Sequence, residues 1–343
     1  MNFSAQQRAA AKSVVALFFS ALLIAAAIAT TAQTQAPTPS PALLVLNKSA
    51  NQLAILDPAT KQVIARIETG EGPHEVAASD DGKLAFVTNY GAKDPGHSLS
   101  VIDLVARKEI HRVDLGPLGR PHGVLFADGK LYFTAELNKL IARYDPATNK
   151  VDWLLGIGQN RTHMLIRTKY LNEIFTSNVD SDTVTAIEKS SDASGWKETN
   201  ISVGKGPEGI DISPDDKEVW AANSGDGTAS VIDVATSKVI HTFNVHTKHS
   251  NRLKFTNDGK LVLISDPGSN ELMIVDTATR KVVKQLNVGR GPGGTLIAPN
   301  GDVAYVALAG DNAVAVIDLH KLEIATRIPT GEGPDGLAWA QRR

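Results

Sequence analysis

The chain contains 343 residues, of which 42% are hydrophobic and 21% are charged, and its formal net charge is -2. This near-neutral charge, with lysine and arginine scattered along the chain, argues against a nucleic-acid partner. Because the sequence has no cysteine, the protein forms no disulfide and carries no lipid on cysteine.

The N-terminal segment differs in composition from the rest of the chain. Arg8 and Lys12 precede an apolar run over residues 14–29, and small residues follow it. This pattern predicts a secretory signal peptide over residues 1–32 and a periplasmic or extracellular protein. The alternative is an uncleaved anchor, which would be the only membrane contact, although the run is shorter than the roughly 20 residues of a spanning helix. Residues 33–41 (QTQAPTPSP) are predicted to form a proline-rich linker.

A repeat fills the remainder of the chain. Its clearest copy, residues 203–243, holds four short apolar runs, rich in Val and Ile and separated by Gly, Pro and Asp. Such a unit predicts a four-stranded antiparallel sheet. We expect the acidic residue that closes the third run to cap the following turn through its carboxylate. It recurs every 42 to 46 residues, as Asp57, Asp103, Asp145, Glu188, Asp233, Asp276 and Asp318.

The two ends of the repeat region complement each other. At Ala42 the chain starts with the second strand of a unit, and it ends with a lone first strand over residues 337–340. A period of about 40–50 residues, each a small sheet, is typical of a β-propeller. The sequence therefore predicts an all-β fold over residues 42–343. We expect a monomeric seven-bladed β-propeller of four-stranded antiparallel blades, closed where the C-terminal inner strand joins the N-terminal blade.

The repeat resembles the YVTN-type β-propeller family. The resemblance is carried by Phe86-Val87-Thr88-Asn89, by Gly206-Pro207-Glu208-Gly209 and by the run over residues 231–236, and it extends from Ala42 to Ala340. It implies the seven-bladed fold. It does not fix the function, since relatives include surface-layer-like proteins, lactonases and a domain of a copper enzyme.

The residue after the Gly-Pro position opens the first strand of each unit, which lines the central channel of a propeller. In chain order these residues are His74, His122, His163, Glu208, Asn251, Gly293 and Asp335. The predicted ligand-binding residues of the channel mouth are His74, His122, His163, Arg120, Arg161, Glu208, Asn251, Arg252 and Asp335. Imidazoles that converge on one axis can also hold a metal. We therefore predict His74, His122 and His163 as candidate ligands of a divalent metal ion.

Two functions of different classes follow. The absence of a strong catalytic motif favours an exported binding or interaction module, with a small anion, another small molecule, a glycan or a protein as its ligand at the channel rim. The alternative is a hydrolase or lyase that is similar to the seven-bladed lactonases. That resemblance implies His122 as a general acid or base, Glu136 as its carboxylate partner and Arg161 as a clamp for an anion. The lactonase family usually has Pro-Arg-His where this chain has Arg-Pro-His.

A third function is suggested by similarity to the propeller domain of nitrous oxide reductase. That enzyme also needs a copper domain with cysteine ligands, and this chain has no cysteine. Only a metal site without redox chemistry remains from this comparison.

Overall fold

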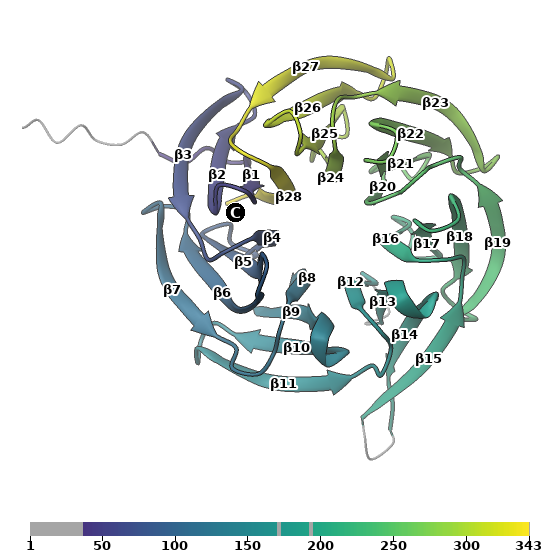
Figure 1. The fold of residues 1–343 in the computed structure, drawn as a ribbon, viewed down its shortest axis with the longest axis horizontal. Coiled ribbons are helices and arrows are strands. Elements are labelled where there is room, and N and C mark those ends of the chain that lie inside the picture. The colour runs from purple at the N-terminus through teal and green to yellow at the C-terminus, as the bar shows by residue number, and fades with distance from the viewer. Residues whose placement is uncertain (1–36, 170–172, 192–194, 343) are drawn as a thin grey trace, which may run out of the picture. The chain divides into compact units, whose positions relative to one another are not determined.

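The computed structural model describes residues 37–169, 173–191 and 195–342 (Figure 1). These residues form seven four-stranded antiparallel sheets arranged as blades around a central axis. The prediction of an all-β, seven-bladed propeller is confirmed. Two short 3₁₀ helices, η1 (Glu136–Asn138) and η2 (Val179–Ser181), follow the second strands of two blades. No helix among these residues is long and apolar enough to cross a membrane.

Each blade runs from an inner strand beside the axis to an outer strand on the rim of the ring. Blade 1 contains β28 (Pro334–Ala340), β1 (Ala42–Asn47), β2 (Gln52–Asp57) and β3 (Gln62–Glu68). Blade 2 contains β4 (Pro73–Ala78), β5 (Leu84–Gly91), β6 (Pro95–Asp103) and β7 (Lys108–Asp114). Blade 3 contains β8 (Pro121–Ala127), β9 (Lys130–Ala135), β10 (Leu140–Asp145) and β11 (Lys150–Gly156).

The remaining blades repeat this order around the ring. Blade 4 contains β12 (Thr162–Arg167), β13 (Ile174–Asn178), β14 (Thr183–Lys189) and β15 (Trp196–Ser202). Blade 5 contains β16 (Pro207–Ile212), β17 (Glu218–Asn223), β18 (Thr228–Asp233) and β19 (Lys238–Asn244). Blade 6 contains β20 (Leu253–Phe255), β21 (Leu261–Asp266), β22 (Glu271–Asp276) and β23 (Lys281–Asn287). Blade 7 contains β24 (Pro292–Ile297), β25 (Val303–Leu308), β26 (Ala313–Asp318) and β27 (Glu323–Pro329).

The ring closes as the sequence predicts. β28 pairs antiparallel with β1, with Leu43 opposite Trp339 and Val45 opposite Leu337. All six residues of β1 are buried. The inner edge of the N-terminal blade is thus paired by the far end of the chain, which removes an exposed strand edge that could pair with other chains.

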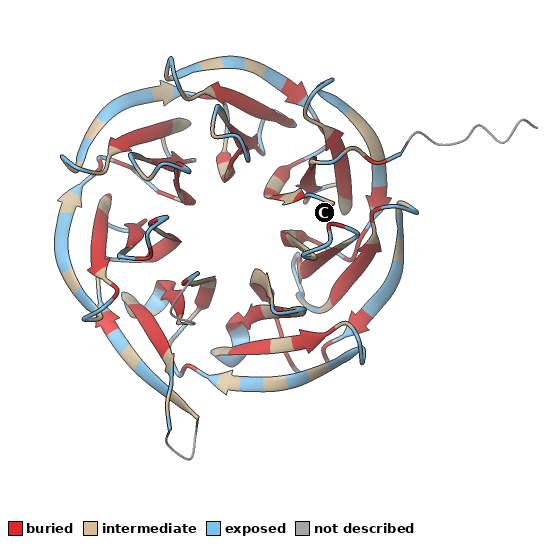
Figure 2. Ribbon diagram, turned by 180° about the vertical axis from the view of Figure 1, so that it is seen from behind, coloured by how far each residue is buried: buried red, intermediate tan, exposed pale blue. Residues whose placement is uncertain are grey.

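The core lies between the blades. The middle strands are buried and the outer strands are largely exposed (Figure 2). Trp220 of blade 5 is fully buried and contacts Phe243 of its own blade and Phe255 of the next. Turn capping by the recurring acidic residue is also observed: Asp233 accepts hydrogen bonds from the N–H and the hydroxyl of Thr236, at 2.8 and 2.6 Å.

The segment before β1 lies partly against the propeller. Thr38 is buried, and its hydroxyl donates a hydrogen bond to the carbonyl of Leu104 at 2.6 Å. The guanidinium of Arg342, at the opposite end of the chain, donates to the carbonyl of Thr38. The end of the predicted 33–41 linker is therefore held on the propeller. The predicted signal peptide and residues 33–36 lie outside the described residues.

Candidate functional site at the channel mouth

A β-bulge opens the inner strands and sets the direction of the rim side chains. In blade 2 the pairs Pro73–Asn89 and Val76–Val87 flank His74 and Glu75, so two residues lie opposite the single residue Thr88. The same two-against-one arrangement occurs in blades 1, 3, 4, 5 and 7. A bulge of this kind bends a strand and re-aims its side chains. The rim residues of these six blades therefore share one structural position, whereas Asn251 of blade 6 lies before the inner strand β20.

Neighbouring inner strands approach closely at this level. A Cβ atom on Gly123 would lie 2.6 Å from the carbonyl oxygen of His163, so only glycine allows this approach. Hydroxyl groups also join the blades: Thr88 donates to the carbonyl of His122 at 2.9 Å, and Thr134 donates to the carbonyl of His163 at 2.7 Å. These contacts fix the backbone that carries the histidines.

The three predicted histidines come together as a stack of rings. The ring centroids of His74 and His122 are 4.1 Å apart, and those of His122 and His163 are 3.7 Å apart. His122 is fully buried and His163 is 2% exposed. The ring of Tyr90 lies edge-on to His74 and His122, at 5.2 and 5.4 Å. We call His74, His122 and His163 the histidine stack.

Glu136 belongs to His163 rather than to His122. Its Oε1 lies 2.5 Å from Nδ1 of His163, and its Oε2 accepts a hydrogen bond from the hydroxyl of Tyr90 at 2.6 Å. Glu136 stands in η1, directly after β9 of blade 3, and reaches the inner strand of blade 4. The expected His122–Glu136 partnership, taken over from the lactonases, is therefore replaced by a His163–Glu136 pair.

The opposite end of the stack carries a second carboxylate. Asp335 of β28 lies 3.1 Å from Nδ1 of His74, and the ammonium of Lys48 lies 3.4 Å from the same carboxylate. Further along the channel, Arg252 forms a buried ion pair with Glu75.

Other predicted residues complete the ring. Asn251 donates a hydrogen bond to Glu208 at 2.6 Å, and Glu208 lies 3.8 Å from Nε2 of His163. The guanidinium of Arg120 lies 4.7 Å from the centre of the Tyr90 ring. The side chain of Arg161 is 41% exposed and lies 3.9 Å from Glu136. Eight of the nine predicted ligand-binding residues thus gather around one end of the channel, with Arg120 and Arg161 at its outer edge, and Arg252 lies further along it.

Several buried nitrogen atoms of this site have no hydrogen-bond partner. They are both ring nitrogens of His122, Nε2 of His163, Nδ1 of His74 and Nη1 of Arg252. The contact of the His74 nitrogen with Asp335 is not aligned as a hydrogen bond. Buried polar atoms are nearly always paired, because an unpaired one costs about 1–3 kcal/mol. These atoms are therefore the ones that a bound species would contact.

The electrostatics keep two of the histidines uncharged. Burial lowers the pKa of His74 to about 3, with Lys48 and Arg252 adding to the effect against the opposing influence of Asp335. Burial, together with the neighbouring imidazoles, lowers the pKa of His122 well below its ordinary value. Both rings are neutral at pH 7, so each has a lone pair on one ring nitrogen.

The carboxylates remain ionised. Burial opposes the charge of Glu136, but hydrogen bonds from His163 and Tyr90 lower its pKa. Burial likewise opposes the charge of Asp335, but the cations Lys48 and Arg252 lower its pKa.

Two sets of side chains have the geometry to hold a metal ion. One contains His74, Glu75 and His122, and the other contains His122, Glu136 and His163. Within each set the donor atoms all lie within 4.8 Å of one another. His122 belongs to both sets, which makes it the centre of the site.

Two participants were missed by the prediction from sequence. Glu75 is the second residue of the bulge, and the comparison of single rim positions passed over it. Lys48 follows Asn47 just as Tyr90 follows Asn89, at the end of the second strand of a blade. Comparison of this loop position between repeats is the signal that would have found Lys48.

Comparisons with known proteins agree with this fold. Residues 1–205 match the model of the YNCE-like beta-propeller family, and residues 120–301 match that of the cytochrome D1 heme domain. A sequence search of curated proteins finds no match.

Solved structures with the same fold have low sequence identity. A putative 6-phosphogluconolactonase from Bacteroides uniformis has a TM-score of 0.73 at 14% identity, covering 88% of this chain and 99% of its own. The periplasmic gluconolactonase PpgL of Pseudomonas aeruginosa has a TM-score of 0.72 at 15% identity, covering 89% and 100%. The dihydro-heme d1 dehydrogenase NirN has a TM-score of 0.62 at 15% identity, covering 87% and 74%. At these identities the similarity establishes the fold alone. With more than half of its length matched by the first family model, the chain belongs to the YNCE-like beta-propeller family.

Proposed function

We propose that this protein is an exported metal-binding module, in which the histidine stack holds a divalent transition-metal ion at the channel mouth. One observation carries the proposal: three buried imidazoles lie in contact, and four of their ring nitrogens have no hydrogen-bond partner. His122 is the central ligand. The other ligands come either from His74 and Glu75 or from His163 and Glu136.

The charges around the stack favour a cation over an anion. Four carboxylates, those of Glu75, Glu136, Glu208 and Asp335, surround it within the channel. Three cations lie beside them, Lys48, Arg161 and Arg252, which leaves an excess of one negative charge. The neutral imidazoles of His74 and His122 add no positive charge. A metal cation would compensate for this excess.

The donor atoms favour a transition metal. Imidazole nitrogens with one carboxylate suit zinc, copper, nickel or iron, whereas magnesium and calcium prefer sites made of oxygen atoms alone. The hydrogen bond between Nδ1 of His163 and Glu136 supports the same view. In the tautomer that donates from Nδ1, the lone pair is on Nε2, and a carboxylate in this place is the usual outer partner of a metal-binding histidine.

The heme named in one matching family does not fit this site. The imidazoles stack on one another at 3.7 and 4.1 Å, Tyr90 lies against their edges, and Arg252 crosses the channel to Glu75. His122, at the centre, is fully buried among the other two imidazoles and Tyr90, which leaves no room for a planar macrocycle beside it. We therefore derive no function through heme.

Export is part of the proposal. It is supported by the basic, apolar and small-residue pattern of residues 1–32. A protein of the same fold from Pseudomonas aeruginosa is named as periplasmic. N-terminal sequencing of the protein recovered from the periplasm or the medium tests this part. We expect a mature chain that begins near residue 33, and full-length protein in the cytoplasm would contradict export.

Calorimetric titration of metal-free protein with Zn²⁺ tests metal binding. We expect one ion per chain. His122→Ala should weaken binding by more than the roughly 10–100-fold that the loss of an outer partner costs. His320→Ala is the matched control, since the side chain of His320 is 75% exposed and distant from the stack. Equal binding by wild type and His122→Ala would overturn the proposal.

Hydrolysis of a lactone is the second candidate. A hollow of about 410 Å³ at the rim is lined by Tyr90, Glu136, Leu137, Lys139, Asn160, Arg161 and Asp180. Arg161 could hold an anionic substrate there, and Glu136 is within reach of the same space. His122, however, is fully buried and does not line the hollow. A general base at His122 would need Tyr90 to move aside, which makes this candidate the weaker one.

A lactone screen with wild type and Glu136→Gln distinguishes the two functions. The metal-binding proposal expects no turnover that depends on Glu136. Turnover by wild type, lost in Glu136→Gln and kept in Glu198→Gln on the exposed face, would favour the hydrolase instead.

A further inference from the structure

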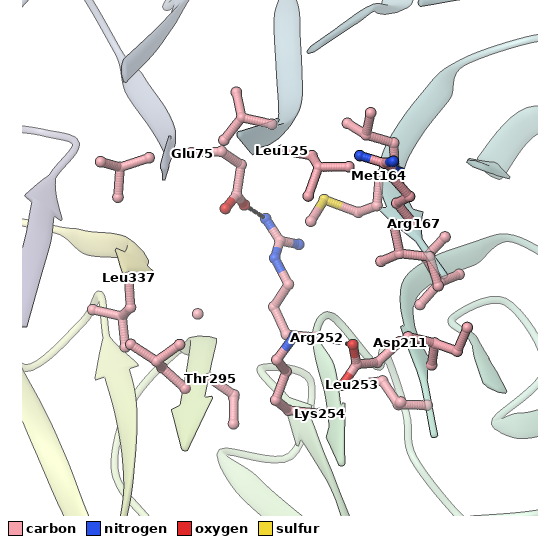
Figure 3. Close-up of a pocket in the computed structure, with 18 residues that line it drawn as sticks. Glu75, Leu125, Met164, Arg167, Asp211, Arg252, Leu253, Lys254, Thr295 and Leu337 are labelled. Carbon is pink, nitrogen blue, oxygen red and sulfur yellow. Dashed lines mark hydrogen bonds and ion pairs between the residues drawn. The ribbon is translucent and has the colours of Figure 1, made fainter. Parts of the chain in front are cut away.

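The channel has a second compartment beyond the histidine stack. Arg252 extends from the start of β20 across the channel to Glu75 on β4, as Figure 3 shows. On the far side of this ion pair is a cavity of about 320 Å³. This volume lies at the lower end of the range for small-molecule sites, about 300–1,000 Å³. The cavity is separate from the residues that form the proposed metal site, apart from Glu75.

The walls of this compartment combine hydrocarbon and polar groups in similar measure. Inner strands of several blades contribute Val76, Leu125, Met164, Leu165, Leu253 and Leu337. An apolar wall with a few fixed polar groups is the usual composition of a ligand site. A ligand with a hydrocarbon part would remove this surface from water, at about 25 cal/mol per Å² of apolar area buried.

One polar group at the closed end has an unused hydrogen-bond donor. The side chain of Arg252 is 7% exposed. One terminal nitrogen of its guanidinium donates to Glu75, and the other, Nη1, is buried without a partner. Figure 3 places this guanidinium in the middle of the lining residues. A buried donor on a charged group strongly favours an acceptor oxygen, and a carboxylate is the acceptor that matches guanidinium best.

The charge of this compartment is opposite to that of the channel mouth. Its lining includes the cations Arg167, Arg252 and Lys254 and the carboxylates Glu75 and Asp211, an excess of one positive charge. Two of these cations already have partners: Lys254 lies 3.0 Å from Asp211, and Arg167 lies 2.7 Å from Asp128. Arg252 is paired as well, with Glu75, but its Nη1 is buried without a hydrogen-bond partner, so this nitrogen is the atom that a ligand would contact.

We propose that the far half of the channel binds a small monocarboxylate with a hydrocarbon tail. Its carboxylate accepts a hydrogen bond from Nη1 of Arg252, and its tail lies against Leu125, Met164 and Leu337, which line the cavity and are partly exposed. The two proposed sites share Glu75 alone, and the ligand would use the nitrogen of Arg252 that does not pair with Glu75.

Calorimetry with hexanoate and hexanol as matched probes tests the proposal. Both have the same hydrocarbon tail, and only hexanoate has a carboxylate. On the unchanged protein we expect hexanoate to bind at least about tenfold more tightly than hexanol, because the guanidinium hydrogen bond is charge-assisted. No binding of hexanoate, or equal binding of the two probes, would overturn the proposal without need of any variant.

Two variants locate the site. Arg252→Met should reduce hexanoate binding to the level of hexanol. Met164→Trp leaves both members of the ion pair in place and puts a larger side chain into the cavity, since Met164 is partly exposed and lies among the lining residues beside Arg252. It should abolish binding of both probes, and it tests the proposal if Arg252→Met fails to fold. Leu154→Trp is the matched control, since Leu154 is 53% exposed on the outer strand of blade 3. Hexanoate binding that survives Met164→Trp places the ligand elsewhere and overturns the proposal.

Discussion

Glu136 and His163 stand on neighbouring blades and form a close polar contact, with Oε1 of Glu136 2.5 Å from Nδ1 of His163. The hydroxyl of Tyr90, from a third blade, donates to the other oxygen of the same carboxylate at 2.6 Å. Three blades therefore fix the orientation of one imidazole. Such fixation is typical of a ring that must present its other nitrogen to a ligand.

Replacement of Glu136 by Gln should weaken metal binding while the fold is kept. The amide can no longer hold His163 in one tautomer through a charge-assisted hydrogen bond, so we expect Zn²⁺ affinity to fall by about 10–100-fold. Calorimetric titration measures the change. Glu198→Gln, on an exposed strand position, is the control, and an unchanged affinity in Glu136→Gln would show that the carboxylate does not support the site.

The metal-free protein should lose stability as the pH falls from 6.5 to 4.5. The folded-state pKa of His74 is lowered to about 3, and that of His122 is lowered as well. The unfolded chain therefore binds protons in this range that the folded chain does not. The free energy of unfolding is then fully present above pH 6.5 and decreases as the pH falls, by up to about 1.4 kcal/mol per pH unit for each such histidine.

Urea unfolding at several pH values measures this dependence. His122→Phe should flatten the curve between pH 6.5 and 4.5, while His320→Ala on the surface should not. The depressed pKa values of Glu136 and Asp335 also reduce stability in acid, but mainly below their ordinary values of 4.5 and 3.8. A wild-type curve that is flat from pH 6.5 to 4.5 would contradict the buried, neutral state of the histidines.

The hydroxyl of Thr134 should contribute both to stability and to the site. It donates to the carbonyl of His163 across the boundary between blades 3 and 4. Thr134→Val removes this donor at nearly constant shape and should cost about 1 kcal/mol of unfolding free energy. Thr134→Ser keeps the hydroxyl and should retain most of the stability. Equal losses in the two variants would mean that packing, not the hydrogen bond, is responsible.

Closure of the ring by β28 should be essential to the fold. A chain that ends at Gly333 lacks Trp339, whose indole N–H donates to the carbonyl of Ile297, and leaves the buried strand β1 with an open edge. We expect this truncated protein to aggregate or to lose its cooperative thermal transition. A chain that ends at Gln341 keeps β28 and should unfold near the wild-type temperature. A stable, monomeric protein ending at Gly333 would contradict closure through β28.

The fold was predictable because each blade of a propeller corresponds to one repeat of the sequence. Each blade needs four strands and three turns, so turn residues recur at a nearly constant spacing. The missing first strand before Ala42 and the surplus strand at Leu337 together specified both the blade number and the way the ring closes.

The site was predictable only in part. The position of the histidines followed from the register of the repeat, because equivalent residues of a ring face one axis. The side-chain pairings between blades could not be predicted from this register. Glu136 of blade 3 contacts His163 of blade 4 rather than His122 of its own blade. The ion pair of Arg252 and Glu75 joins residues 177 positions apart. It depends on the bulge that turns both His74 and Glu75 out of strict alternation.

Anomalous diffraction from crystals of the Zn²⁺-loaded protein tests the central claim most directly. The account predicts one strong peak at the edge of the histidine stack, with a ring nitrogen of His122 at about 2.0–2.1 Å from the ion. A peak only at surface residues, or no peak in the channel at full loading, would contradict it.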